Sequence, residues 1–301
     1  MRPAIVLCLV MPLWCNAQMG LKFRFPGNDL YQYNYTTVSP AFAGIDGQKL
    51  SFFGGLYAYK NSGYDGTGFV GYEARIDKIN SGVGFNLNNN TYANRTFSDL
   101  NFMYNYQWEI AEDRTLVIGA KFVSSQMVID FSEIYPVNPA DPLLDPMITA
   151  RATQTSGGVG VLYKHNKTFA GFSVDNLIRG KTRLYDNLYS VSGYDERNYN
   201  LVIGRNARVG KASSLTYSLY VLNRKDLWRF DFNSAILIND RFIGGLSLEI
   251  NNNDSDNNYY PKVNAGIKAG DHARFVMSVY SEGYNFGNKR FSGQLMMLFT
   301  L

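Results

Sequence analysis

The mature chain has no cysteine, and this absence excludes several kinds of chemistry. The two cysteines of the sequence, Cys8 and Cys15, both lie in a first segment that we expect to be removed. Without them the chain can form no disulfide, no thiolate nucleophile and no cysteine-ligated metal site. An exported chain of this size that lacks disulfides needs a large core or closed pairing of its strands.

Long hydrophobic runs and clustered charges are scarce as well. After the first segment no run approaches the ~20 apolar residues of a membrane-spanning helix. Charged residues make up 18% of the chain, below the usual share of about a quarter. The net charge of +4 is spread along the chain. It forms no cluster of lysine and arginine, so we expect no nucleic-acid partner.

Histidine is rare too, which bears on catalysis. The chain has two, His165 and His272, and both fall on turns that we expect to face the periplasm. Neither has a serine and an aspartate close by, so a Ser-His-Asp hydrolase is not predicted. The glycine-rich run 156–160 lacks the following helix and the lysine of a phosphate loop. We expect glycine there to relieve crowding or to allow curvature, and we expect no enzyme activity and no cofactor.

The first segment has the pattern of a signal peptide. Arg2 precedes an apolar run over residues 4–15, and Ala17 supplies a small residue for cleavage. The run is too short to cross a membrane as a helix. We therefore assign residues 1–17 to a signal peptide and expect the rest of the chain to be exported.

Aromatic residues and glycine are abundant in what remains. Aromatics make up 15% of the chain, with 22 tyrosines, and there are 28 glycines. Low charge with many aromatics favours a transmembrane β-barrel with aromatic girdles. An array of secreted β-sandwiches is the soluble alternative.

Alternation of apolar and polar residues predicts strands of membrane-spanning length. In 98–110, apolar residues such as Phe102 and Trp108 occupy one face, and Asp99 and Asn101 occupy the other. This pattern predicts an all-β fold, an up-and-down antiparallel barrel of about 14 strands over residues 48–301. The strands are expected near 48–60, 67–77, 82–89, 97–110, 115–127, 152–164, 168–175, 198–209, 213–222, 227–238, 241–250, 261–270, 273–282 and 291–301.

The connections alternate between tight and long, which fixes the expected orientation. Tight connections fall at 77–81, 111–114 and 239–240, whereas 88–96 and 128–151 are long. Outer-membrane barrels have short periplasmic turns and longer extracellular loops. We therefore expect the outer membrane of a Gram-negative bacterium, contact with lipid and lipopolysaccharide, and a periplasmic N-terminus.

The barrel also predicts where the charged residues point. Those on the polar faces should face the lumen and pair there, leaving either a polar conduit or a filled interior. The residues concerned are Asp99, Arg229, Asp231, Glu249, Lys262, Lys268 and Arg274.

Residues 18–47 are expected to form an N-terminal arm ahead of the first strand. Tyr31, Tyr33 and Tyr35 alternate with polar residues and predict an extended stretch. Pro40 should bend it, and Gly44 permits positive φ. The stretch is either an ordinary strand entry or a plug and docking arm, for which the candidate residues are Tyr31, Gln32, Tyr33, Pro40, Phe42 and Gly44.

Two loops are candidate binding sites, one for a partner protein and one for a cation. The loop 136–146 is stiff and acidic, and it is either a partner-docking site or a simple cover, with Pro136, Pro139, Pro142 and Asp145 as candidates. In 251–258, the spacing of Asp254, Asp256 and Asn258 matches the first ligands of a calcium loop. A glycine and a final glutamate are missing there, so a solvated turn is the alternative.

The chain resembles the PorP/SprF family of outer-membrane proteins of the type IX secretion system and gliding machinery. Gln32-Tyr33 and the run Pro40-Ala41-Phe42-Ala43-Gly44 match the start of that family, although Ser39 replaces its usual asparagine. The proline-rich loop 136–146 and the glycine-rich hairpin 157–173 are also similar. An earlier Asn-Pro is absent from 34–37, and Phe52-Phe53-Gly54-Gly55 departs from the family's first strand.

The resemblance implies a role without enzyme activity. Family members support the secretion and surface anchoring of a large partner, typically an adhesin with a C-terminal secretion domain, and contact other secretion components. A barrel of ~14 strands is too narrow to pass a folded domain, so we expect an anchor. The alternatives are a channel for small or hydrophobic solutes and a purely structural membrane protein.

Overall fold

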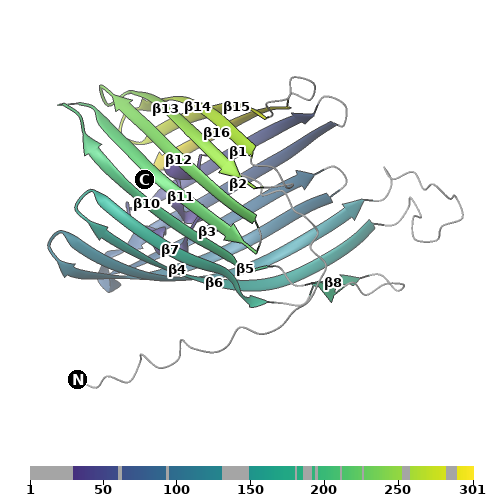
Figure 1. Ribbon diagram of the computed structural model, residues 1–301. Coiled ribbons are helices and arrows are strands. Elements are labelled where there is room, and N and C mark those ends of the chain that lie inside the picture. Colours follow the sequence, from purple (N-terminus) through teal and green to yellow (C-terminus); the bar gives the residue numbers. More distant parts are fainter. Residues whose placement is uncertain are drawn as a thin grey trace, which may run out of the picture.

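The computed structural model shows a closed barrel. It describes residues 30–59, 63–92, 95–130, 149–179, 182–185, 192–193, 196–210, 212–225, 227–252, 258–282 and 290–301. In this part of the chain, fourteen long strands form one closed antiparallel sheet (Figure 1), which confirms the predicted fold class. No helix among the described residues is long and apolar enough to span a membrane.

Each long strand pairs with the strands before and after it along the chain, and the first strand pairs with the last, which closes the ring. The pairing of Phe53 with Met296 is one step of that closing ladder. The strands are β1 Lys49–Tyr59, β2 Gly63–Ile76, β3 Ser81–Tyr92, β4 Arg95–Ala111, β5 Arg114–Asp130, β6 Thr149–His165, β7 Thr168–Arg179, β10 Asn198–Arg208, β11 Ser214–Arg224, β12 Leu227–Ile238, β13 Phe242–Asn251, β14 Asn258–Ala269, β15 Ala273–Glu282 and β16 Arg290–Thr300.

Two details differ from the predicted strands. Two short strands that the sequence did not predict, β8 Thr182–Tyr185 and β9 Ser192–Gly193, lie between β7 and β10, and β8 pairs with β6. The long connection predicted at 88–96 is wrong, because β3 runs on to Tyr92 and β4 begins at Arg95. Both faces of the sheet are polar there, so no alternation marks the strands.

The tight connections predicted from the sequence lie together at one end of the barrel, which we call the turn end. Left-handed backbone at Asn80, Asn166 and the pair Asn239-Asp240 closes three of them. Asparagine and aspartate tolerate this conformation better than most residues. The last strand also ends here, and Figure 1 shows these turns beside the C-terminus. We call the opposite end the loop end.

The outward face of β4 shows which band of the barrel contacts lipid. From Ile110 to Phe102 every outward side chain is apolar or aromatic, and Trp108 is 61% exposed. This stretch has the ~9–11 residues with which a strand crosses a bilayer. Beyond it, Ser98 and Thr96 face outward. Because β4, β5 and β6 each have 17 residues, they project past the band at the loop end (Figure 1).

Candidate functional site

The N-terminal segment lies inside the barrel. Residues 30–47, which we call the plug, fold into three short 3-10 turns, η1 Tyr31–Tyr33, η2 Tyr35–Thr37 and η3 Pro40–Phe42, drawn in purple within the ring of strands (Figure 1). The sequence predicted an extended stretch instead. Side-chain oxygens of Asn34 and Ser39 accept backbone hydrogen bonds at the starts of η2 and η3, which favours turns.

Gly44 fixes the point where the plug leaves the wall. It has φ of +67°, as its predicted role requires. Its backbone N–H donates to Oε2 of Glu73 at 2.8 Å. A Cβ at this position would overlap the carbonyl oxygen of Ala74. Glycine is therefore needed both for conformation and for close approach.

Glycines of the wall form the seat of the plug. At each of them an added Cβ would lie closer to plug atoms than ordinary van der Waals contact, so the plug lies closer to these strands than a larger residue would allow. This is crowding relief of the kind expected for the run 156–160. The contacts join Gly82 to Ala43, Gly84 to Ala43, Gly119 to Pro40 and Ala41, Gly160 to Ser39 and Gly171 to Phe42.

Side chains of the wall satisfy the plug's backbone carbonyls. Asn105 of β4 is fully buried, and its Nδ2 donates to the carbonyl oxygen of Ala43 at 2.6 Å. The same nitrogen lies 3.3 Å from the carbonyl oxygens of Pro40 and Ala41. Ser173 of β7 donates to the carbonyl of Val38 at 3.0 Å. Buried carbonyls need such donors, so these residues stabilise the plug in one position.

An aromatic cluster fills the space between the plug and the strands β7 and β11. The ring centroids of Tyr31 and Tyr220 are 4.7 Å apart, and Tyr35 lies 5.0 Å from Phe42 and 5.1 Å from Phe169. Burial raises the pKa of Tyr35 to about 12, so its phenol stays neutral. These centroid distances lie within the ~4.5–7 Å range of favourable aromatic pairs. Phe42 is partly buried and packs against this cluster.

Tyr33 and its neighbours pack against the opposite side of the barrel, which includes β1, β2 and β16. Leu30 is fully buried in a second hydrophobic cluster with Phe53, Phe69 and Met296, and Tyr33 packs against that cluster. Gln32 is also buried. Tyr31 and Tyr33 therefore pack against clusters on opposite sides of the lumen, and the plug crosses it from wall to wall.

Four charged residues form a buried network in the lumen. Arg229 lies 2.7 Å from the Asp231 carboxylate and 3.2 Å from that of Glu249. Lys262 lies 2.5 Å from the same Glu249 oxygen. The neighbouring Asn233 donates to the Tyr31 hydroxyl. For these four of the seven charges, the inward pairing predicted from the sequence is present, and the network adjoins the plug.

The remaining predicted positions are not part of this arrangement. Pro136, Pro139, Pro142, Asp145, Asp254 and Asp256 lie outside the described residues, and Asn258 is described as the first residue of β14. His165 contacts Asp113 and His272 contacts the Thr300 carbonyl, both at the turn end. In the described part of the chain, no group of three or more histidine, aspartate or glutamate side chains is placed to hold a metal.

The residues that sequence reasoning missed are Asn105 and the seat glycines other than Gly160. Gly82, Gly84, Gly119 and Gly160 occupy lumen-facing positions of strands, where a filled barrel needs larger side chains. A row of inward glycines on neighbouring strands is a signal that another segment fills the space. It could have been found by placing the strands in register.

Comparison with solved structures shows the same fold. The chain is similar to the Ralstonia pickettii toluene transporter TbuX, with a TM-score of 0.55 and 9% identity over 88% of this chain and 92% of that one. It is also similar to a Pseudomonas aeruginosa FadL homologue, with a TM-score of 0.52 and 10% identity over 87% and 92% of the two chains.

No curated protein matches the chain. A family model does: residues 26–294 match the type IX secretion system membrane protein PorP/SprF. The match includes the plug and nearly all of the barrel, and it agrees with the resemblance of the segment 32–44. The chain therefore belongs to the PorP/SprF family of type IX secretion system membrane proteins.

Proposed function

We propose that this barrel is a non-enzymatic outer-membrane anchor that supports the secretion and surface display of a large partner with a C-terminal secretion domain. The observation that carries the proposal is the plugged lumen. The plug contacts both walls and is hydrogen bonded to β4 and β7. A polypeptide cannot pass through a lumen that is packed in this way.

The orientation follows from the two ends. Short turns face the periplasm in outer-membrane barrels, and the plug joins β1 at the turn end. In the proposed orientation β1 starts on the periplasmic side, where we also expect the N-terminus, and the loop end faces the cell exterior. There, the projecting parts of β4, β5 and β6 present polar outward residues such as Gln126, Arg151 and Thr153. This rim is suited to hold a surface protein against the barrel.

In this proposal a separate translocon moves the partner, and the barrel holds it by its rim and loops. The membrane side of the barrel contacts lipid and lipopolysaccharide, and the periplasmic turns are available to other secretion components. The partner is adhesin-like, and gliding is one activity that such a surface protein would serve.

The experiment locks the plug in place. An ideal Cβ on Gly84 lies 3.1 Å from the Cβ of Ala43, close to the ~3.5–4.5 Å of a disulfide. The double variant Ala43→Cys/Gly84→Cys should therefore cross-link in the oxidising periplasm. Surface labelling of the partner is then compared among wild type, locked barrel, each single variant and a deletion of the gene.

An anchor predicts loss of display in the deletion and unchanged display with the locked plug. If display stops with the locked plug and returns with the single variants, the partner passes through the lumen and the anchor is refuted. Measurements on the purified barrel in liposomes test the alternative function, a solute channel. An anchor is silent, whereas a solute channel would conduct or take up solute while its plug remains in place.

A further inference from the structure

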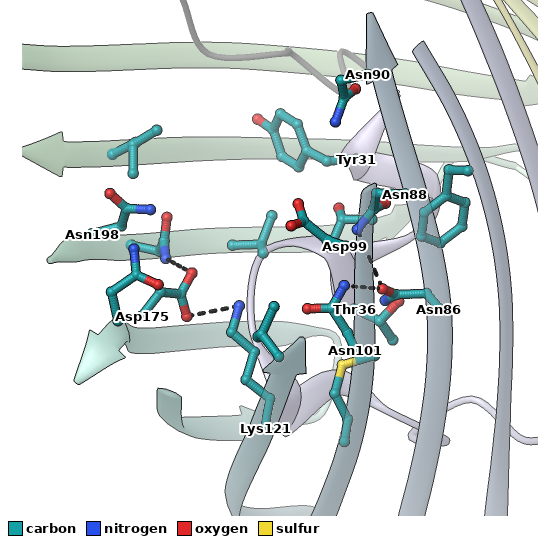
Figure 2. A pocket seen from close by; sticks show the side chains of 18 of the residues that line it. Tyr31, Thr36, Asn86, Asn88, Asn90, Asp99, Asn101, Lys121, Asp175 and Asn198 are labelled. Atoms are coloured by element: carbon teal, nitrogen blue, oxygen red, sulfur yellow. Dashed lines mark hydrogen bonds and ion pairs between the residues drawn. The ribbon is translucent and has the colours of Figure 1, made fainter. Parts of the chain in front are cut away.

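The loop-end half of the lumen contains a cavity of about 330 Å³. Its floor includes Tyr31 and Thr36 of the plug, and its walls are strands β1 to β7 and β10 to β12 (Figure 2). The volume is at the lower end of the ~300–1,000 Å³ of small-molecule sites. It is thus large enough for a small ligand, and it plays no part in the proposed anchoring.

The cavity is built by a change of residue type along the strands. On β3, the inward positions next to the plug are Gly82 and Gly84, and the following inward positions are Asn86, Asn88 and Asn90. Side chains of modest size and high hydrogen-bonding capacity replace glycine where the plug ends. The strand therefore lines the cavity with carboxamides, each with two donors and one acceptor oxygen.

Several of these carboxamides have unused hydrogen-bonding atoms. Asn101 and Asn88 donate to Asn86 at 2.6 and 3.4 Å, which leaves their own Oδ1 atoms without a partner among the described residues. Asn90 accepts from Thr67, and its Nδ2 has no partner in the described part of the chain. Across the cavity, Oδ1 of Asn198 is buried without a partner in the same part of the chain. The unpaired Asn198 oxygen is buried, which is costly, and the free atoms of Asn88, Asn90 and Asn101 line the cavity, so a ligand that pairs with these groups gains affinity.

The charged side chains around the cavity are already engaged. Lys121 and Asp175 form an ion pair at 2.8 Å (Figure 2). Arg229 is paired with Asp231. Asp99 also has an interaction partner. The unused groups are therefore neutral donors and acceptors, which favours a neutral ligand over an anion or a cation.

A peptide strand fits this cavity poorly. Recognition of an extended peptide commonly adds a strand to a free sheet edge, whereas the strands of this wall pair on both sides in a closed ring. A compact ligand with several hydroxyl groups matches better, because each hydroxyl both donates and accepts. The rings of Tyr31, Phe53 and Phe69 also line the cavity and supply apolar area for a sugar face.

From these observations we infer that the cavity binds a small neutral saccharide. Asn88 and Asn101 on one side and Asn198 on the other hold its hydroxyl groups, as their placement in Figure 2 indicates. The source is either a free sugar at the cell surface or a glycan of a neighbouring molecule. This binding is independent of the anchor, since it uses no residue of the projecting rim.

The test uses the mature full-length barrel in detergent and a panel of neutral mono- and disaccharides, measured by titration calorimetry. We expect at least one to bind, and the double variant Asn88→Ala/Asn101→Ala to weaken that binding tenfold or more. Asn89→Ala is the matched control, because Asn89 lies on the same strand but is exposed on the outer face. Heat-dependent mobility on a gel checks that each variant is folded.

Further arms separate the sources and the alternatives. A neutral O-antigen oligosaccharide of lipopolysaccharide and a neutral glycopeptide distinguish a membrane glycan from a protein glycan, and binding of either supports the inference. The inference is overturned if no neutral saccharide binds, if only acidic sugars or an unglycosylated peptide bind, or if Asn89→Ala weakens binding as much as the double variant. None of these outcomes changes the result of the locked-plug experiment.

Discussion

The two halves of the lumen are built on the same strands and differ in how they are filled. At the turn end, Val202 of β10 and Gly171 of β7 pack against plug side chains. Two to four residues further along the same faces, Asn200, Asn198 and Asp175 border a cavity. One half has the packing of a protein core, and the other keeps polar groups around open space. The plug is therefore part of the fold, whereas the cavity is available for binding.

We expect the largest loss of stability from a substitution in the buried charged network of the lumen. Arg229→Met leaves the carboxylates of Asp231 and Glu249 buried without this cation. We expect a loss of stability of about 3–5 kcal/mol, because removing one member of a buried network leaves uncompensated charge. Urea unfolding in detergent, followed by tryptophan fluorescence, measures it. Arg241→Met at the turn end, where Arg241 is exposed, should have little effect, and equal effects would contradict the argument.

A second substitution tests the tight seat of the plug. Gly82→Ala places a methyl group on the Ala43 carbonyl, so the plug or the strand must shift. We expect a cost of about 1–3 kcal/mol and faster protease cleavage in the plug. Gly54→Ala is the control, because nothing lies within 4 Å of an added Cβ there. Similar behaviour of both variants would show that the seat is not tight.

A third test compares substitutions of two asparagines on the same face of β4. Asn105→Leu removes the donor to the carbonyls of Ala43, Ala41 and Pro40, and should cost about 1–3 kcal/mol. Amide hydrogen exchange of the plug should become faster. Asn101→Leu, on the cavity side, should leave plug exchange unchanged. If both variants loosen the plug alike, the two halves are more strongly coupled than their packing indicates.

The smallest expected effect concerns pH at the exit of the plug. Partial desolvation alone would raise the pKa of Asp46, but Lys49 at 2.9 Å and Lys164 lower it below its ordinary value. The interaction therefore adds stability above about pH 4 and loses it as the pH falls through the lowered pKa. Since the side chain is 62% exposed, the gain is below about 0.5 kcal/mol. Asp46→Asn should remove this small pH dependence of unfolding, whereas a large change would contradict it.

The long strands were predictable because lipid and lumen impose opposite demands on alternate residues. That signal ends where the strands leave the membrane. Around Asn89, both faces are polar, and the ends of β3 and β4 could not be placed. The short strands β8 and β9 have too few residues to show alternation.

The shape of the plug was not predictable from its own residues. Tyr31, Tyr33 and Tyr35 alternate like a strand, yet they pack into different clusters on different walls. The turns depend on local capping by Asn34 and Ser39, and on strands that are distant in sequence. The positive φ of Gly44 could be predicted because glycine is the residue type that adopts it most readily. The seat glycines required knowledge of what lies opposite them.

The way in which the ring closes has a consequence for biogenesis. Since β1 pairs with β16, the barrel cannot close until the last strand has been delivered to the assembly machinery. The partners that hold the plug's backbone, from Glu73 of β2 to Ser173 of β7, all occur in the first seven strands. An open half-sheet can therefore receive the plug before closure, and the plug can act as a template around which the later strands curl.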